Sequence, residues 1–105
     1  LAMGWSDGET LKSIALFVDW NGANIEFHLA GGLSRQIIRD VLNYVFRQLN
    51  ATRLTAKPYA SEHRLIEILS RVGFVREATM EDYYGVGEDA EIYRLSRADA
   101  RKWMK

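Results

Sequence analysis

The 105-residue sequence contains no cysteine, only one proline, and no excess of charge of either sign. Without cysteine, the chain has no disulfide, no thiolate nucleophile and no cysteine-ligated zinc. Its 14 Lys and Arg residues balance 14 Asp and Glu residues, which disfavours binding of nucleic acid or an anionic membrane through bulk charge. No apolar run approaches the roughly 20 residues of a membrane span, and no secretory signal is visible. We therefore expect a cytoplasmic protein without a membrane partner.

The residues that are present describe an ordinary globular domain. Hydrophobic residues make up 48% of the chain and charged residues 27%, which argues against disorder. The length fits a single domain over residues 1–105. Residues 1–4 do not begin with Met, so we interpret them as a cloning remnant or as part of a longer chain and leave them outside the predicted fold.

The first half of the chain predicts a hairpin followed by a helix. Residues 14–20 and 25–29 are rich in β-forming residues and flank Asn21-Gly22, a pattern that predicts a β-hairpin. Apolar residues then recur at steps of three and four, which predicts a helix of about four turns with one buried face. Ser34 is the expected N-cap of this helix and Asn50 its expected end.

The second half predicts an alternation of strands and helices. We expect strands over residues 53–57, 74–78 and 90–95, and helices over residues 62–72 and 97–105. Gly73 is the expected stop of the first of these helices, and Ser96 the cap of the second. The whole order predicts an α/β fold, in which helices pack on a mixed β-sheet. The crossover from Glu26 to Leu54 should be right-handed, which makes the two strands parallel.

The most informative segment is the glycine-containing loop between the second strand and the long helix, residues 28–36. Free backbone N–H groups at a helix N-terminus bind anions, and glycine lets the backbone approach a phosphate closely. Arg35, with Arg39 one turn later, could add charge-assisted hydrogen bonds. The alternative interpretation is a plain tight turn at Gly31-Gly32. No Walker lysine follows, so a nucleoside triphosphate loop is not supported.

Together with this loop, residues 60–77 and 89–97 resemble the GCN5-related N-acetyltransferase (GNAT) family. Val72-Gly73-Phe74, followed by Glu77-Ala78, stands where the family has Leu-Gly-Phe and then Glu-Gly. The segment ending in Leu95-Ser96-Arg97 is similar to the family's last strand. The resemblance covers residues 14–97 and implies an acyl-CoA N-acyltransferase-like fold without the usual N-terminal pair of helices.

The resemblance implies acetyl-CoA as the cofactor. The family's loop pattern, Arg/Gln-x-x-Gly-x-Gly/Ala, falls on Leu29, Gly32 and Ser34, of which Gly32 matches. The pantetheine arm is then expected where two parallel strands separate, and the acetyl carbonyl is expected to accept a backbone N–H near residues 28–30. The implied cofactor-binding residues are Phe27, Leu29, Ala30, Gly31, Gly32, Leu33, Ser34, Arg35, Gln36 and Glu62.

Two positions depart from the family pattern. Glu62 occupies the place of the family's Asn near the start of the second helix, which puts a carboxylate near the cofactor. The Tyr that many members use to protonate the leaving thiolate aligns with Leu69.

Three side chains are candidates for handling protons. Glu26 and His28 are two residues apart on one strand and so share a face. Either could accept a proton from an ammonium nucleophile, or they could be a polar pair on a solvated strand. Tyr84, in Tyr83-Tyr84-Gly85, could act as a general acid or line an acceptor pocket, or it could belong to a half-buried hairpin. The two His residues give no metal-ligand spacing, and no metal is expected.

The predicted function is acetyl-CoA-dependent N-acetyl transfer to an amine of a protein or small molecule by direct attack. The alternative is a catalytically inactive acetyltransferase-fold module for binding or assembly, as part of a larger protein or a phage particle. Nucleic-acid binding is the least supported class. A homodimer contact could form through Trp103 and Met104, because aromatic residues and Met are enriched in interface cores.

Overall fold

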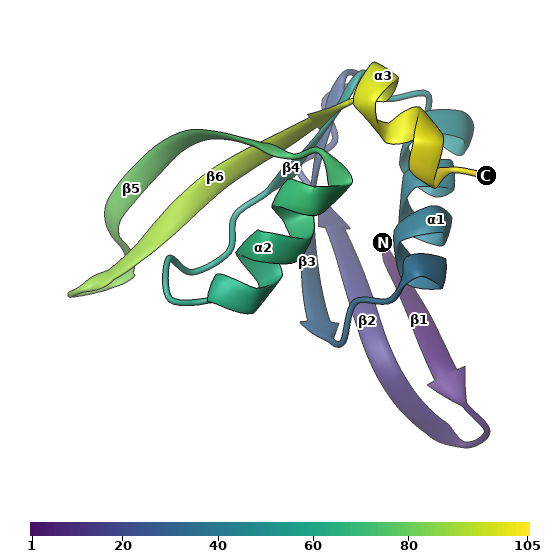
Figure 1. Ribbon diagram of the computed structural model, residues 1–105, viewed down its shortest axis with the longest axis horizontal. Coiled ribbons are helices and arrows are strands. Elements are labelled where there is room, and N and C mark those ends of the chain that lie inside the picture. Colours follow the sequence, from purple (N-terminus) through teal and green to yellow (C-terminus); the bar gives the residue numbers. More distant parts are fainter.

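A computed structural model describes all 105 residues as one six-stranded sheet with three α-helices (Figure 1). The strand order is β1-β2-β3-β4-β6-β5, and only the β3–β4 pair is parallel. The strands are β1 (Ala2–Asp7), β2 (Thr10–Val18), β3 (Asn24–Gly31), β4 (Arg53–Ala56), β5 (Val75–Gly85) and β6 (Glu88–Ser96). The helices are α1 (Arg35–Asn43), α2 (His63–Val72) and α3 (Arg97–Ala100). The predicted mixed α/β architecture and the parallel crossover are confirmed.

The predicted helix boundaries have the expected physical causes. The Ser34 hydroxyl accepts a hydrogen bond from the Ile37 N–H at 3.2 Å and caps α1. The helix continues through a π-helical turn, Tyr44–Gln48, and the chain then reverses at Asn50, whose φ is 58°. Gly73 follows α2 with a φ of 120°, a conformation that glycine adopts without strain.

The N-terminal residues are part of the sheet, contrary to their exclusion from the predicted fold. Ala2, Met3 and Gly4 lie in β1, where Ala2 pairs with Leu16 of β2. The Trp5 indole N–H donates a hydrogen bond of 2.9 Å to Asp40 of α1 and ties this edge strand to the helix layer. β1 also forms a local hairpin with β2 that closes at Asp7 and Thr10, with Gly8 in the turn.

The C-terminal segment is shorter as an α-helix than predicted. Regular α-helix ends at Ala100, and a 3-10 turn, Arg101–Trp103, follows. Met104, expected at a dimer contact, is 8% exposed and belongs to the chain's own core. The carbonyl of Met104 accepts a hydrogen bond of 3.0 Å from the Asn43 side chain, so this end of the chain packs on α1.

Both long helices pack on the same face of the sheet. Residues of α1 and α2 line one small apolar gap together with Phe27 of β3 and Leu54 of β4. Side chains alternate along a strand, so the neighbours of these residues point to the opposite face, which no helix of this chain covers. Leu16 and Val18 lie on that face and are 50% and 39% exposed.

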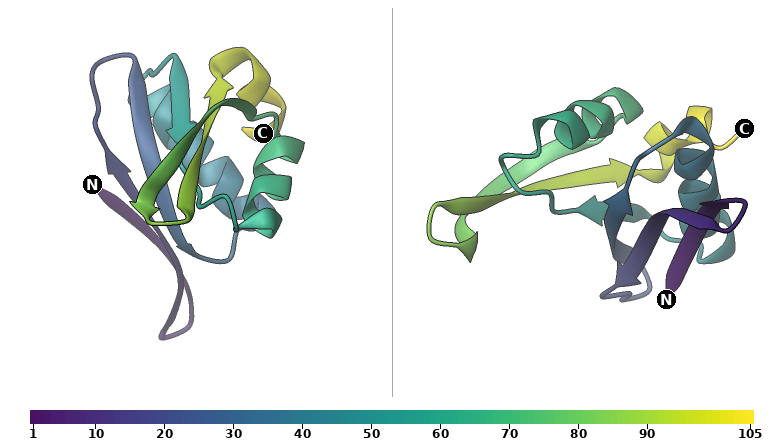
Figure 2. Two further views of the ribbon diagram at one scale, coloured as in Figure 1. Left: turned by 90° about the vertical axis from the view of Figure 1, so that its left-hand side faces the viewer. Right: turned by 90° about the horizontal axis from the view of Figure 1, so that it is seen from below.

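The sheet is strongly twisted, as the two views in Figure 2 show. The β1–β2 hairpin and the β5–β6 hairpin project from the central strands in different directions (Figure 1). The central parallel pair, β3 and β4, lies between them. No helix of the chain is long and apolar enough to cross a membrane.

Candidate functional site

The two central parallel strands separate halfway along β3. They pair from Asn24 opposite Arg53 to Phe27 opposite Ala56, and no further. Strand β3 continues along β2 to Gly31, whereas the chain after β4 turns toward β6, where the Pro58 carbonyl accepts a hydrogen bond from the Glu91 N–H. The pairing with β3 therefore stops at Ala56, while the chain at Pro58 stays next to β6.

The separation opens a cleft of about 290 Å³. Residues from both strands, the following loop, α2 and the β5–β6 hairpin line it: Phe27, His28, Leu29, Ala56, Lys57, Pro58, Tyr59, Glu62, Leu65, Leu69 and Tyr84. We call this space the cleft.

The backbone of Leu29 faces the cleft. Phe17 exchanges backbone hydrogen bonds with Leu1 on the β1 side, so the neighbouring Leu16 directs its backbone toward β3, where it pairs with His28. Successive residues of a strand point their N–H groups to opposite sides, and the N–H and C=O of Leu29 are therefore directed toward β4. Leu29 lies two residues beyond Phe27, the last residue of β3 that pairs with β4.

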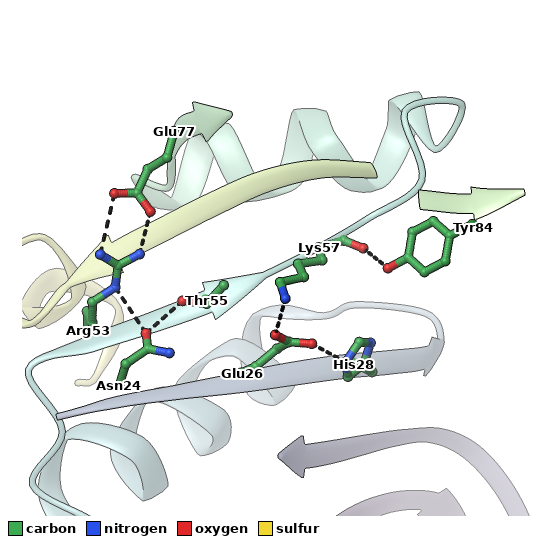
Figure 3. A network of polar contacts seen from close by, with 8 residues as sticks. All are labelled: Asn24, Glu26, His28, Arg53, Thr55, Lys57, Glu77 and Tyr84. Atoms are coloured by element: carbon green, nitrogen blue, oxygen red, sulfur yellow. Dashed lines mark hydrogen bonds and ion pairs between the residues drawn. The ribbon is translucent and has the colours of Figure 1, made fainter. Parts of the chain in front are cut away.

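Three charged or titratable side chains meet beside the cleft on the sheet face that carries no helix (Figure 3). The Glu26 carboxylate is only 9% exposed and contacts His28 Nε2 at 2.6 Å and Lys57 Nζ at 2.9 Å. The hydrogen bond to Glu26 raises the pKa of Lys57 above its usual value, so this amine carries its charge at neutral pH. The predicted pairing of Glu26 and His28 on one strand face is confirmed in geometry.

Tyrosines form the wall of the cleft opposite β3. The Tyr84 hydroxyl donates a hydrogen bond to the Lys57 carbonyl, and its ring stacks on Tyr59 with centroids 4.0 Å apart. Burial raises the pKa of Tyr84, which keeps the hydroxyl protonated at neutral pH. The Lys57 ammonium lies 5.6 Å from the centroid of the Tyr83 ring, a cation–π distance.

The glycine loop borders a second hollow, of about 450 Å³, that shares Leu29, Glu62 and Leu65 with the cleft. Gly31, Gly32 and Leu33 line one side of it, and Ser61, His63, Arg64 and Ile68 of the α2 region line the other. Gly31 has a φ of 99°, and a Cβ there would lie 2.2 Å from the Lys12 carbonyl oxygen, so glycine is required. A Cβ on Gly32 would meet nothing within 4 Å.

The structure gathers part of the predicted site around the cleft and distributes the rest. The predicted residues Phe27, His28, Leu29, Glu62 and Tyr84 line the cleft, and Glu26 contacts it through His28 and Lys57. Leu69 also lines it, at the place where the family pattern has Tyr. The predicted residues Gly32, Leu33, Ser34 and Gln36 border a further hollow next to Trp5 and Lys12.

Three predicted residues have other contacts. The guanidinium of Arg35 lies 5.3 Å from the centroid of the Trp103 ring. Ala30 pairs with Ile14 in the sheet. The Glu62 carboxylate accepts a hydrogen bond of 3.0 Å from the Tyr59 N–H and holds the loop that follows β4.

Sequence reasoning missed Lys57 and Tyr59 as parts of the site. A signal for Lys57 existed: it follows Thr55 by two residues on the strand predicted to lie parallel to that of Glu26, so alternation puts all three on one face. Tyr59 had no signal, because its place depends on how the chain turns after Pro58.

Comparison with known proteins bears out the fold. No family model and no curated protein sequence matches the chain. The structure of the spermidine/spermine N-acetyltransferase SpeG from Vibrio cholerae is similar, with a TM-score of 0.82 and 16% sequence identity over 95% of this chain and 68% of that one. YncA from Salmonella typhimurium, solved with its cofactor acetyl-CoA, has a TM-score of 0.72 and 17% identity over 87% of this chain and 61% of that one.

At these identities the likeness concerns the fold. This chain spans about two thirds of the length of the similar proteins. The mixed sheet, the helix order and the separation of β3 from β4 are features of the chain's own structure and do not depend on that likeness. The chain has the acyl-CoA N-acyltransferase fold of the GCN5-related acetyltransferases.

Proposed function

We propose that this chain binds acetyl-CoA in the cleft and transfers the acetyl group to an amine of a protein or small molecule. The observation that carries the proposal is the separation of β3 and β4, which leaves the backbone of Leu29 directed into an open cleft. The fold supports it, because YncA of the same fold was solved with acetyl-CoA and SpeG is named as a spermidine N-acetyltransferase.

The residues present fit such a ligand. Hydrophobic residues make up 7 of the 11 that line the cleft, which suits an arm of apolar and amide groups, and the strand edges offer backbone partners to the amides. The adjoining hollow has the N-terminal side of α1 on one side and His63 and Arg64 on the other. A helix N-terminus and nearby basic side chains suit a pyrophosphate.

Acetyl-CoA supplies the acetyl group as a thioester that an amine attacks directly. The Leu29 N–H is placed to donate a hydrogen bond to an oxygen in the cleft, where charge would develop during transfer. Glu26 contacts the cleft residues His28 and Lys57 and can take a proton from an amine, and His28, 2.6 Å away and 42% exposed, can pass that proton to solvent. The Tyr84 hydroxyl already donates to the Lys57 carbonyl, so we place it in the wall.

A second candidate function follows from Leu69. This side chain is 1% exposed and occupies the cleft wall where many family members have the proton-donating Tyr. A chain without that donor could bind acetyl-CoA and present it, or the fold itself, to a partner without turnover. The two candidates share the binding step and differ in release of free CoA with an amine.

Calorimetric titration with acetyl-CoA tests the binding step. The wild-type chain should show saturable binding, and Gly32→Glu should weaken it at least about 10-fold, because a carboxylate would enter the hollow beside the glycine loop. Ser70→Glu adds the same charge on an exposed position of α2 and should bind like wild type. Absence of binding to wild type contradicts the proposal.

If acetyl-CoA binds, release of free CoA should be measured with a panel of amines that includes polyamines and lysine peptides. Amine-dependent release that Gly32→Glu lowers supports acetyl transfer. Binding without release by any amine favours the non-catalytic candidate.

A further inference from the structure

We propose that Lys57 is itself an acetyl acceptor, modified on its side-chain nitrogen by acetyl-CoA bound in the cleft of the same chain. This inference rests on the proposed binding of acetyl-CoA. It concerns a residue of the chain rather than an external acceptor, and it can fail while binding of acetyl-CoA stands.

The position of Lys57 is the first argument. It directly follows Ala56, the last residue of β4 that pairs with β3, so it stands where the two strands separate. It lines the cleft together with Leu29, whose N–H faces the same space from the other strand. Its side chain is 23% exposed, so the amine is neither sealed in the core nor free in solvent.

The partner of Lys57 is the second argument. The amine lies 2.9 Å from a Glu26 oxygen, and the other Glu26 oxygen lies 2.6 Å from His28 Nε2 (Figure 3). Attack by an amine needs a base that removes its proton. Glu26 holds Lys57 as an ammonium in the resting chain, so the proton must pass to Glu26 as the nitrogen attacks, and the two groups are already in contact for that transfer. The arrangement that an external amine must reach by binding is present within the chain, which raises the effective concentration of this acceptor.

The remaining lysines are the third argument. The chain has Lys12, Lys102 and Lys105 in addition to Lys57, and all three are exposed. The cleft has none of them among its lining residues. Lys57 is thus the amine that combines a place in the cleft with a carboxylate partner.

The step balances in atoms and charge without a further reactant. The Lys57 ammonium gives one proton to Glu26, and the neutral nitrogen forms a bond to the thioester carbonyl carbon. The carbon–sulfur bond breaks with its electron pair on sulfur, and the second nitrogen proton goes to the thiolate, which leaves as CoA-SH. Glu26 returns its proton to solvent through His28. The products are an amide on Lys57, CoA-SH and one proton.

Acetylation would change the cleft in two ways. The amide carries no charge, so Glu26 loses one of its two partners and keeps His28. The added acetyl group remains on a residue that lines the cleft, where it competes for space with the ligand. The modified chain should therefore bind acetyl-CoA more weakly than the unmodified chain.

The test is site-resolved mass spectrometry of the full chain after incubation with isotope-labelled acetyl-CoA. Uncatalysed acetylation favours exposed lysines, so the three exposed lysines give the background in each sample. The inference predicts that Lys57 is modified at least about 10-fold faster than any of them, with a rate constant that does not depend on protein concentration. Lys57 modified no faster than the exposed lysines would overturn it.

Variants separate this inference from the proposed function. Glu26→Gln removes the base and should slow acetylation of Lys57 about 100-fold, while the exposed lysines keep their background rates. Gly32→Glu should lower the acetylation rate of Lys57 to that of the exposed lysines. The control Ser70→Glu should leave the acetylation rate of Lys57 at the wild-type value. Lys57→Arg should lose the modification, and because Lys57 lines the cleft, the affinity of this variant for acetyl-CoA is measured by calorimetry alongside. If acetyl-CoA binds but Lys57 is acetylated no faster than the exposed lysines, the inference about Lys57 is wrong and the proposed binding stands. If acetyl-CoA does not bind, both the inference and the proposed function are wrong.

Discussion

Polar side chains gather at both ends of the β3–β4 pair, but their surroundings differ. At the paired end, Asn24 accepts hydrogen bonds from Arg53 at 3.0 Å and Thr55 at 2.6 Å, and Arg53 forms an ion pair with Glu77 (Figure 3). At the separated end, Glu26 contacts His28 and Lys57 on the same sheet face. Polar side chains at the paired end form hydrogen bonds with one another across the strands. Those at the separated end lie beside an open cleft.

The comparison indicates that the candidate site forms where β3 and β4 stop pairing. β4 stops pairing with β3 after Ala56, and Gly31, the last residue of β3, has a φ of 99° that lets the chain turn toward α1. Between these two breaks, the Leu29 backbone and the Glu26–Lys57 pair are left beside open space. Variants that act on one end and spare the other test this division.

The largest expected effect is a loss of stability at the paired end. Leu54 is 0% exposed under α1 and α2, and Leu54→Ala should lower the free energy of unfolding by about 2–5 kcal/mol through lost burial and a cavity. Leu65 is only partly buried at the cleft, and Leu65→Ala should cost less than about 2 kcal/mol because solvent can enter. Chemical denaturation measures both, and equal costs would contradict the division.

The next effect separates the two glycines of the loop. Gly31→Ala should destabilise the chain by about 1–3 kcal/mol, because Gly31 has a φ of 99° and a Cβ there would press on the Lys12 carbonyl. Gly32→Ala should change stability by less than about 0.5 kcal/mol, because its Cβ would meet open space. Thermal unfolding of the two variants is the measurement, and a reversed order would refute the account of the turn.

The smallest effect is the pH dependence of the Glu26–Lys57 pair. Because the pKa of Lys57 is raised above 10.5, its contribution to stability is fully present below pH 10.5 and is lost as the pH rises through the folded value. The free energy of unfolding of wild type should exceed that of Lys57→Met by about 1 kcal/mol or less at neutral pH. This difference should disappear at high pH. A gap that stays constant with pH would show that the ion pair is not its cause.

Tyr84 requires a separate variant in that experiment. Its pKa is also raised, from 10.0, so its ionisation lowers stability over the same alkaline range. Tyr84→Phe removes this contribution, and comparing Lys57→Met in the Tyr84→Phe background isolates the amine. The alkaline loss should become smaller with each substitution.

Local patterns predicted most of the fold. The Asn21-Gly22 hairpin, the α1 stripe with its Ser34 cap and the Gly73 stop all depend on neighbours in sequence, and all are confirmed. Strand β1 was missed because residues 1–4 were set aside, although a local signal was present. β1 and β2 form a hairpin that closes at Asp7 and Thr10, and Gly8 lies in its turn with a φ of 63°.

The site was predicted in part, because some of its contacts join neighbours in sequence and others join distant segments of the chain. Alternation placed Glu26 and His28 together, and the order of strand, glycines and helix located the loop. Sequence reasoning could not place the Arg35 side chain on Trp103, because this contact depends on the C-terminal turn packing against α1. Alternation could have placed Lys57 on the face of Thr55, but the register that sets Thr55 opposite Glu26 comes from the three-dimensional pairing.

The most direct test of the central claim is an amide NMR titration of the chain with acetyl-CoA. The account predicts saturable shifts that include the Leu29 amide and the residues of the cleft and glycine loop. Gly32→Glu should abolish these shifts at the same ligand concentrations. Saturable shifts confined to another surface, or no shifts at millimolar acetyl-CoA, would contradict the assignment of the cleft as the acetyl-CoA site.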